Sequence, residues 1–197
     1  MQNFLCKFFS GMSVLILASA LLTGCGHEKP HAFNWKVGNF QATDETGQDF
    51  GLSDLKGKVW LADFVFTHCQ TVCPPMTRNM AALQEQLKKS EAKAQIVSFT
   101  VDPKRDSPDV LKKFAKEQGA DLSNWHLLTG YSFDKIKSLS EKSFKSAVSK
   151  PAKGNDQYTH GTNIFLIDQK GTIVQKYNGY SDVPYDDIIK DVKALNE

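Results

Sequence analysis

Two cysteines between a strand and a helix constrain this chain more than any other feature. The apolar run from Val59 to Phe66 predicts a buried strand, and Pro74-Pro75 opens an amphipathic helix that runs from Met76 to Lys89. Cys69 and Cys73 therefore lie where a strand meets a helix N-terminus. If the turn is helical, the i, i+4 spacing puts both sulfurs on one face, and the unpaired N–H groups of the helix start favour thiolate. Such a pair serves reversible disulfide chemistry or binds a soft metal.

Length, charge and cysteine placement narrow the class of protein. A chain of 197 residues predicts one domain with a real core. The net charge is only +2 and no basic stripe is interleaved with aromatic residues, so nucleic acid is not an expected partner. Cys6 and Cys25 lie in the first segment, which leaves Cys69 and Cys73 as the cysteines of the folded part.

The first segment is typical of a targeting signal. Lys7 is followed by an apolar stretch from Met12 to Leu22, and Leu22-Thr23-Gly24-Cys25 resembles a bacterial lipobox. We expect residues 1–24 to be a lipoprotein signal peptide and Cys25 to carry the lipid. An ordinary signal peptide or an uncleaved anchor is the alternative. The predicted location is the extracytoplasmic face of the cell membrane, where the cysteine pair rests as a disulfide unless it is reduced or metallated.

The remaining chain divides into a tether, residues 25–32, and one domain, residues 33–197. In the domain, strand and helix signals alternate and end in an antiparallel hairpin, which predicts an α/β fold with parallel βαβ units. A cysteine pair after the first central strand makes that order resemble thioredoxin, with a mixed central sheet, flanking helices and an N-terminal β-hairpin extension. The expected strands are 33–40, 49–52, 59–66, 95–101, 125–128, 162–168 and 172–178, and the expected helices are 76–89, 110–118, 133–142 and 185–195.

The spacing of the cysteines departs from that of thioredoxin. This chain carries Cys-x-x-x-Cys, and three intervening residues allow the loop to open around one ion between two thiolates. His160 precedes the C-terminal hairpin, in a segment that lies against the cysteine loop in a thioredoxin-like fold. Two thiolates and an imidazole suit copper(I) and copper(II), whereas zinc usually takes four ligands in structural sites. The absence of a carboxylate disfavours magnesium, calcium and manganese.

Three motifs together resemble the Sco/SenC family of copper-binding thioredoxin-fold proteins. They are Asp63-Phe64-x-Phe66-Thr67-x-Cys69-x-x-x-Cys73-Pro74, then Val101-Asp102-Pro103-x-Arg105-Asp106, and then His160. The resemblance runs from Phe33 to the end of the chain. It implies that Cys69, Cys73 and His160 bind copper, and that the protein helps to assemble the dinuclear copper centre of cytochrome c oxidase subunit II. It also implies that Asp102 and Asp106 assist partner or metal interactions.

Several of these residues also have plainer interpretations. His68 follows a strand end beside Cys69, so it is expected to lie next to the site or in solvent rather than to bind metal. Met76 is a plausible weak copper ligand, but helix methionines usually fill core gaps. His126 lies in an apolar strand and is expected to be buried or half-buried. Asp102 and Asp106 also fit turn and cap roles, and the histidines of the tether, His27 and His31, fit solvated spacers.

Three functions use the same cysteines. The first is a non-catalytic copper carrier that passes its ion to a partner by ligand exchange. The second is a thiol–disulfide reductase that keeps the partner's cysteines reduced and has no need of His160. The third is a peroxidase of the peroxiredoxin kind, for which nothing in the sequence points to peroxide. The first two roles are compatible, since an oxidised pair cannot bind copper, and both require an external thiol reductant.

Overall fold

The structure, a computed structural model, describes residues 29–197. The predicted signal peptide, the lipidation site Cys25 and the tether residue His27 lie outside the described residues. Among the helices of residues 29–197, none is both long enough and apolar enough to span a membrane.

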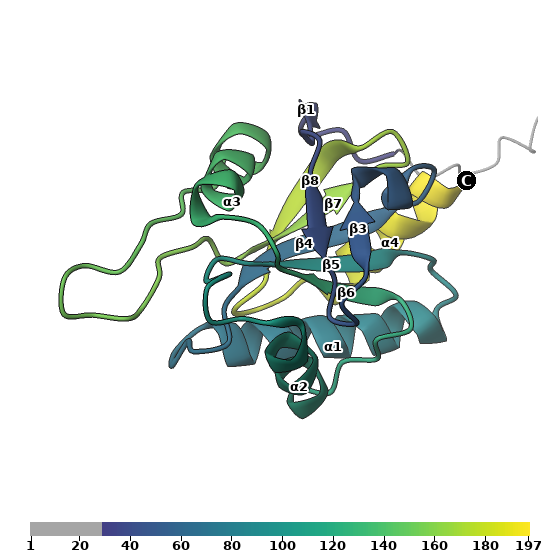
Figure 1. The fold of residues 1–197 in the computed structure, drawn as a ribbon. Coiled ribbons are helices and arrows are strands. Elements are labelled where there is room, and N and C mark those ends of the chain that lie inside the picture. Colours follow the sequence, from purple (N-terminus) through teal and green to yellow (C-terminus); the bar gives the residue numbers. More distant parts are fainter. Residues whose placement is uncertain (1–28) are drawn as a thin grey trace, which may run out of the picture.

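A mixed six-stranded sheet forms the centre of the fold (Figure 1). Its strands follow the order β1-β8-β7-β4-β5-β6, in which β4, β5 and β6 are parallel and β7 runs antiparallel to β4. The predicted thioredoxin-like α/β class is therefore confirmed. The strand bounds are β1 Trp35–Lys36, β4 Trp60–Val65, β5 Gln95–Thr100, β6 Trp125–Leu128, β7 Asn163–Ile167 and β8 Thr172–Asn178.

Within residues 29–197, four α-helices complete the layers. In Figure 1, α1 (Cys73–Lys89) and α2 (Pro108–Glu117) lie on one side of the sheet, and α3 (Phe133–Leu139) lies on the other. The last helix, α4 (Tyr185–Asn196), packs beside α1. Helix α1 begins earlier than the sequence predicts. Cys73, and not Met76, is its first residue, and two prolines occupy the first turn.

The central strands end together at one edge of the sheet. Every residue of β4 is buried, as its apolar sequence predicts, and Val65 pairs with Thr100 in the parallel register of β4 and β5. The loops that follow these two strands, residues 66–72 and 101–107, therefore begin side by side. In α/β sheets this carboxyl edge is where ligands usually bind.

The N-terminal segment differs from the prediction. We expected its hairpin to use residues 33–40, but β2 (Gln41–Thr43) pairs with β3 (Asp49–Gly51), and a short 3₁₀ turn, η1 (Leu52–Leu55), follows. Two of the residues expected in that hairpin, Trp35 and Lys36, form β1 of the main sheet instead, where Trp35 pairs with Ile173 of β8. The unpaired edge of β8 offered backbone partners that sequence alone does not reveal.

The helix predicted over residues 133–142 also changes character. It is α-helical only to Leu139, and a π-helical turn, η2 (Ser140–Phe144), then ends at Lys145, which has a left-handed φ of 52°. The Ser140 hydroxyl donates a hydrogen bond of 2.7 Å to the Ser146 carbonyl and closes this end. The turn leaves Phe144 buried against Phe64, Phe99 and Phe165.

Candidate metal centre

Three segments converge at the carboxyl edge of β4. Cys69 lies in the loop after β4, and Cys73 opens α1. His160 comes from the segment before β7, and the antiparallel pairing of β7 with β4 brings that segment next to the end of β4. Ser149 and Thr159 exchange two backbone hydrogen bonds, which close the long loop between them immediately before the histidine.

The three side chains meet at hydrogen-bonding distance. His160 Nε2 lies 3.0 Å from Cys73 Sγ, and the backbone N–H of Cys73 donates to Cys69 Sγ over 3.3 Å. One ligand atom from each residue lies within 4.8 Å of the others. Both cysteines are buried and free, so the site is in its reduced form.

The histidine is oriented by its neighbours. His160 Nδ1 lies 2.9 Å from the carbonyl oxygen of Gly161, which can only accept, so Nδ1 carries the proton. The imidazole ring stands edge-on to Phe66, with 5.8 Å between the ring centroids. Nε2 is therefore left with a lone pair that faces the sulfurs, as a metal ligand requires.

The two thiols differ in acidity. The hydrogen bond from the Cys73 side chain holds the pKa of Cys69 well below its ordinary value, against the effect of burial, and the Cys73 backbone N–H acts in the same direction as that side chain. Burial raises the pKa of Cys73, and the adjacent Cys69 raises it further. The two opposite shifts favour a thiolate on Cys69 and a protonated thiol on Cys73. A metal that binds both sulfurs has to displace that single proton.

Asp106 anchors the loop that carries Cys69. Its buried carboxylate accepts hydrogen bonds from the Thr67 hydroxyl (2.6 Å), the Thr67 backbone N–H (3.2 Å) and the Thr100 hydroxyl. Asp106 is not the cap of α2, because Ser107 caps that helix by accepting from the Val110 N–H. Asp106 therefore positions Thr67, two residues before Cys69.

Asp102 lies beside this anchor and contacts the next loop through an arginine. Its side chain is 2% exposed, and its carboxylate lies 3.8 Å from Arg105 Nε. The carbonyl of Asp102 accepts from the backbone N–H groups of Arg105 and Asp106, which is the turn role expected for it. Neither aspartate belongs to the cluster of Cys69, Cys73 and His160.

A polar latch joins the histidine segment to the cysteine loop. Asp156 accepts from His68 Nε2 at 2.8 Å and lies 3.5 Å from Arg105. Gln157 donates to the His68 carbonyl and accepts from the Gln70 N–H, both over 3.2 Å. His68 is thus an exposed neighbour of the site. Sequence reasoning missed Asp156 and Gln157 because a polar loop carries no local signal of what it contacts.

Asp63 was also missed as a supporting residue, although an acid within an apolar strand is a visible signal. Its carboxylate is 1% exposed and accepts a 2.6 Å hydrogen bond from Ser98, which in turn accepts from Trp125 Nε1. Its second oxygen is buried without a partner. Burial raises the pKa of Asp63 to about 6, although Ser98 and His160 oppose the shift. Asp63 is therefore a buried carboxyl group close to the site that can bind a proton near pH 6.

The remaining candidates lie away from the cluster or in the core. Met76 is 1% exposed on α1, which fits the expected core role. His126 is half-buried on β6, as expected, with its ring centroid 4.5 Å from that of Phe50.

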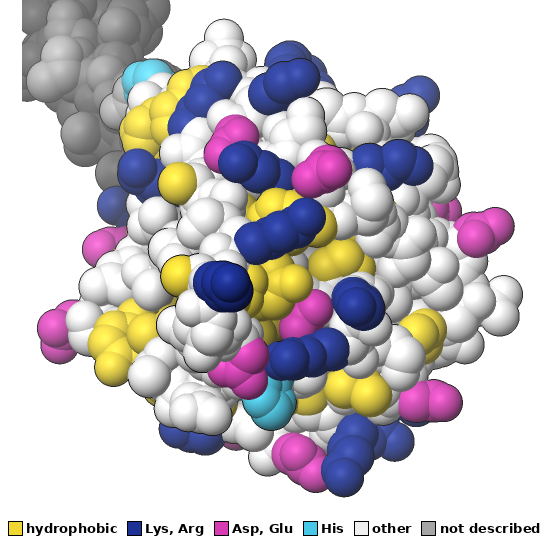
Figure 2. Space-filling view, turned by 60° about the vertical axis from the view of Figure 1, so that its left-hand side comes forward, with side chains coloured by type: hydrophobic (Ala, Val, Ile, Leu, Met, Phe, Trp, Pro, Cys, Tyr) yellow, Lys and Arg dark blue, Asp and Glu magenta, His cyan; other side chains and the backbone are white. Residues whose placement is uncertain are grey.

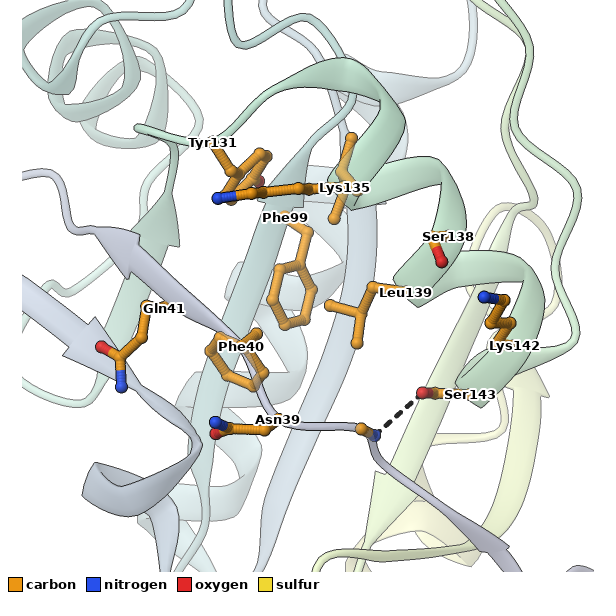
Figure 3. A pocket seen from close by; sticks show the side chains of 12 residues that line it. Asn39, Phe40, Gln41, Phe99, Tyr131, Lys135, Ser138, Leu139, Lys142 and Ser143 are labelled. Atoms are coloured by element: carbon orange, nitrogen blue, oxygen red, sulfur yellow. Dashed lines mark hydrogen bonds between the residues drawn. The ribbon is translucent and has the colours of Figure 1, made fainter.

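The face of the molecule seen in Figure 2 is polar and mixed in charge. Figure 2 shows Lys and Arg side chains interspersed with Asp and Glu around small apolar areas. A hollow of about 480 Å³ lies between residues 38–41 and α3, with Phe40, Phe99 and Leu139 at its floor and Lys135 and Lys142 at its rim (Figure 3). None of the three clustered ligands lines this hollow, so the candidate metal centre does not depend on it.

Known proteins resemble this chain in both sequence and fold. The model of the SCO1/SenC family matches residues 29–197. A SCO1/SenC family lipoprotein from Bacillus anthracis is 52% identical, with a TM-score of 0.82 over 86% of this chain and 99% of that one. BsSco is described as a member of the Sco family of cytochrome c oxidase assembly proteins with a disulfide switch. It is 42% identical, with a TM-score of 0.77 over 85% and 96% of the two chains.

A more distant relative has been solved with its metal. Copper-bound ScoI from Bradyrhizobium japonicum is 27% identical to this chain. Its TM-score is 0.68 over 81% of this chain and 99% of that one.

Proposed function

This chain belongs to the SCO1/SenC family, and we propose that it carries one copper ion on Cys69, Cys73 and His160 to support assembly of the dinuclear copper centre of cytochrome c oxidase subunit II. The observation that carries the proposal is the convergence of two free sulfurs and an oriented imidazole nitrogen within 4.8 Å. The copper-bound relative and the relative described as an oxidase assembly protein support it.

The ligand chemistry fits a metal that is carried and released. Thiolates hold copper(I), and the imidazole extends the set to copper(II). Three protein ligands leave room for an incoming ligand from a partner, so the ion can transfer by stepwise exchange. The site lies at a loop edge under a polar latch, where a partner protein can approach it.

The location follows from the predicted lipid. We propose that Cys25 is acylated on the extracytoplasmic face, and the relative from Bacillus anthracis is a lipoprotein. A tether of residues 25–32 reaches at most about 28 Å when fully extended. The copper site would therefore stay close to the membrane surface, where the partner's copper centre is exposed.

A second function, thiol–disulfide reduction, is favoured by the unequal thiols. A thiolate at Cys69 can attack a partner disulfide, and Cys73 can then release the product by forming the intramolecular disulfide. The partner leaves as a dithiol, and an external thiol reductant restores the pair. The disulfide switch described for BsSco supports this reaction as an accompaniment to copper binding.

An anaerobic copper(II) titration of the reduced full chain in detergent tests the carrier role. Visible absorption from sulfur-to-copper charge transfer should rise to one equivalent in the parent chain and weaken sharply in His160→Ala. His31→Gln is the matched control, because His31 is exposed and belongs to neither the sulfur cluster nor any other group of potential metal ligands among residues 29–197. If copper only oxidises the pair to a disulfide, and His160→Ala behaves as the parent does, the carrier role fails and the reductase role takes its place.

A further inference from the structure

A second group of potential metal ligands lies at the edge strand β6. Asp44 and Glu45 come from the turn between β2 and β3, and His126 comes from β6 itself. One oxygen of each carboxylate and one imidazole nitrogen lie within 4.8 Å of one another. The hairpin is fixed beside β6 by a pair of backbone hydrogen bonds between Thr43 and Thr129, of 2.9 and 2.8 Å.

Both carboxylates are buried, which makes their charge costly. Asp44 is 7% exposed and Glu45 is 2% exposed. The Oδ1 atom of Asp44 accepts from the backbone N–H groups of Thr46 and Gln48 and from the Thr46 hydroxyl, while Glu45 Oε2 accepts from the Leu127 N–H over 2.9 Å. These neutral donors orient the two groups. Burial alone would raise the pKa of Asp44, but the hydrogen bonds from Thr46 and Gln48, together with the nearby His126, hold it below its ordinary value, so a carboxylate is available there to a cation.

His126 acts on Asp44 through space and not by a direct bond. Among residues 29–197, neither a hydrogen bond nor an ion pair within 4.0 Å joins its ring to Asp44 or Glu45. Its Nδ1 is closed to solvent and has no hydrogen-bond partner. Buried polar nitrogens are nearly always bonded, so this one points to a missing ligand.

The spacing of the group is that of ligands around one ion. Metal bonds to carboxylate oxygen and to imidazole nitrogen are about 2.0–2.2 Å long, so two ligands of a common ion lie up to about 4.4 Å apart. Ligand atoms that approach within 4.8 Å without bonding to one another need only a small adjustment to close on such an ion.

We propose that Asp44, Glu45 and His126 form a second metal site, for a divalent first-row ion such as Mn²⁺ or Zn²⁺. Two carboxylates and one imidazole are harder donors than the sulfur cluster, so this site selects against copper(I). The ion pins the β2–β3 hairpin to β6. The two sites share no residue, and β5 lies between β6 and the strand that leads to the cysteines.

Titration of the full chain in detergent with Mn²⁺ tests the site. Cys69→Ser and Cys73→Ser are introduced together so that the sulfur ligands cannot compete. Free Mn²⁺ is measured by its six-line electron paramagnetic resonance signal, which should fall by one equivalent in this parent. His126→Gln and Glu45→Gln should each weaken Mn²⁺ binding at least about tenfold. Glutamine at 45 still offers an oxygen to the Leu127 N–H, so a loss there reports the charge and not the hydrogen bond.

The matched control is Asp49→Asn, which removes an exposed carboxylate from β3 of the same hairpin and should bind as the parent does. Thermal unfolding provides a second measurement. Mn²⁺ should raise the melting temperature of the parent and of Asp49→Asn but not that of His126→Gln. If His126→Gln does not fold, Asp44→Asn replaces it. The proposal is overturned if millimolar Mn²⁺ and Zn²⁺ leave the parent unbound, or if all variants bind equally.

Discussion

The sulfur cluster (Cys69, Cys73 and His160) and the carboxylate cluster (Asp44, Glu45 and His126) have similar geometry but different ligand chemistry. Each gathers three ligand-type side chains from segments that are distant in sequence, within 4.8 Å. The sulfur cluster uses a helix start, which stabilises thiolate, and the carboxylate cluster uses a tight turn whose N–H groups hold Asp44. The local backbone therefore decides which kind of anion each region can hold.

The two regions also differ in their support. Around the sulfurs, buried polar groups from other strands hold the loops, with Asp106 on Thr67 and Asp63 beneath. In the carboxylate cluster the ligands themselves carry the hydrogen bonds of the turn. Changes near the sulfurs can thus be divided into those that remove a ligand and those that release a loop.

Removal of one sulfur ligand should have the largest effect on copper binding, and it tests most directly whether the two clusters are chemically separate. Cys73→Ser should abolish the charge-transfer band of the copper(II) complex and lower copper affinity at least about 100-fold, because a hydroxyl is a far poorer ligand than a thiolate for both copper(I) and copper(II). His126→Gln should leave the band intact. A band that survives in Cys73→Ser, or that is lost in His126→Gln, would show that the two regions are not chemically separate.

Asp106→Ala should cause the largest loss of stability. Removal of this carboxylate leaves the Thr67 N–H and two hydroxyls without their acceptor, at a cost of about 3 kcal/mol in the free energy of unfolding. Urea unfolding measures it, and copper affinity should fall as well because the Cys69 loop is released. Asp109→Ala, an exposed position on α2, should change stability by no more than about 0.5 kcal/mol. Equal losses in both variants would refute the anchor role.

Asp63 predicts how stability depends on pH. Its pKa is 3.8 in a model peptide and about 6 in the fold, so the folded state binds the proton more tightly between these values. Its contribution to stability is fully present below about pH 4, falls as pH rises to about 6, and is lost above that, a change of about 3 kcal/mol. Asp63→Asn should remove the decline and stabilise the protein at pH 8.

Urea unfolding at pH 4 and pH 8 measures this change. Asp134→Asn, an exposed substitution on α3, should keep the decline of the parent. A slope unchanged in Asp63→Asn would assign the pH dependence to other groups.

The latch should give the smallest effect. Asp156→Ala removes exposed contacts with His68 and Arg105, which water and salt already weaken, so copper affinity should fall only about threefold. The difference from the parent should shrink at high salt. A loss as large as that of Cys73→Ser would mean that the latch, and not the sulfur pair, holds the site together.

Prediction from sequence succeeded where the signal was local. The passage from strand to helix at the cysteines and the burial of β4 both follow from neighbouring residues. It was wrong for the first strand of the N-terminal hairpin, because β8 offered a competing edge. The carboxylate cluster of Asp44, Glu45 and His126 could not be predicted from sequence, since six secondary-structure elements separate Glu45 from His126.

By itself, the sequence determined the sheet class, the family and the placement of two thiols at a helix start. These depend on periodicity and short spacings, which neighbouring residues encode. Only the tertiary structure decided that His160 turns Nε2 toward Cys73, that Asp106 bonds to Thr67, and that Asp44 and Glu45 face His126. Such contacts depend on how strands pair and how loops close, and these are properties of the whole chain.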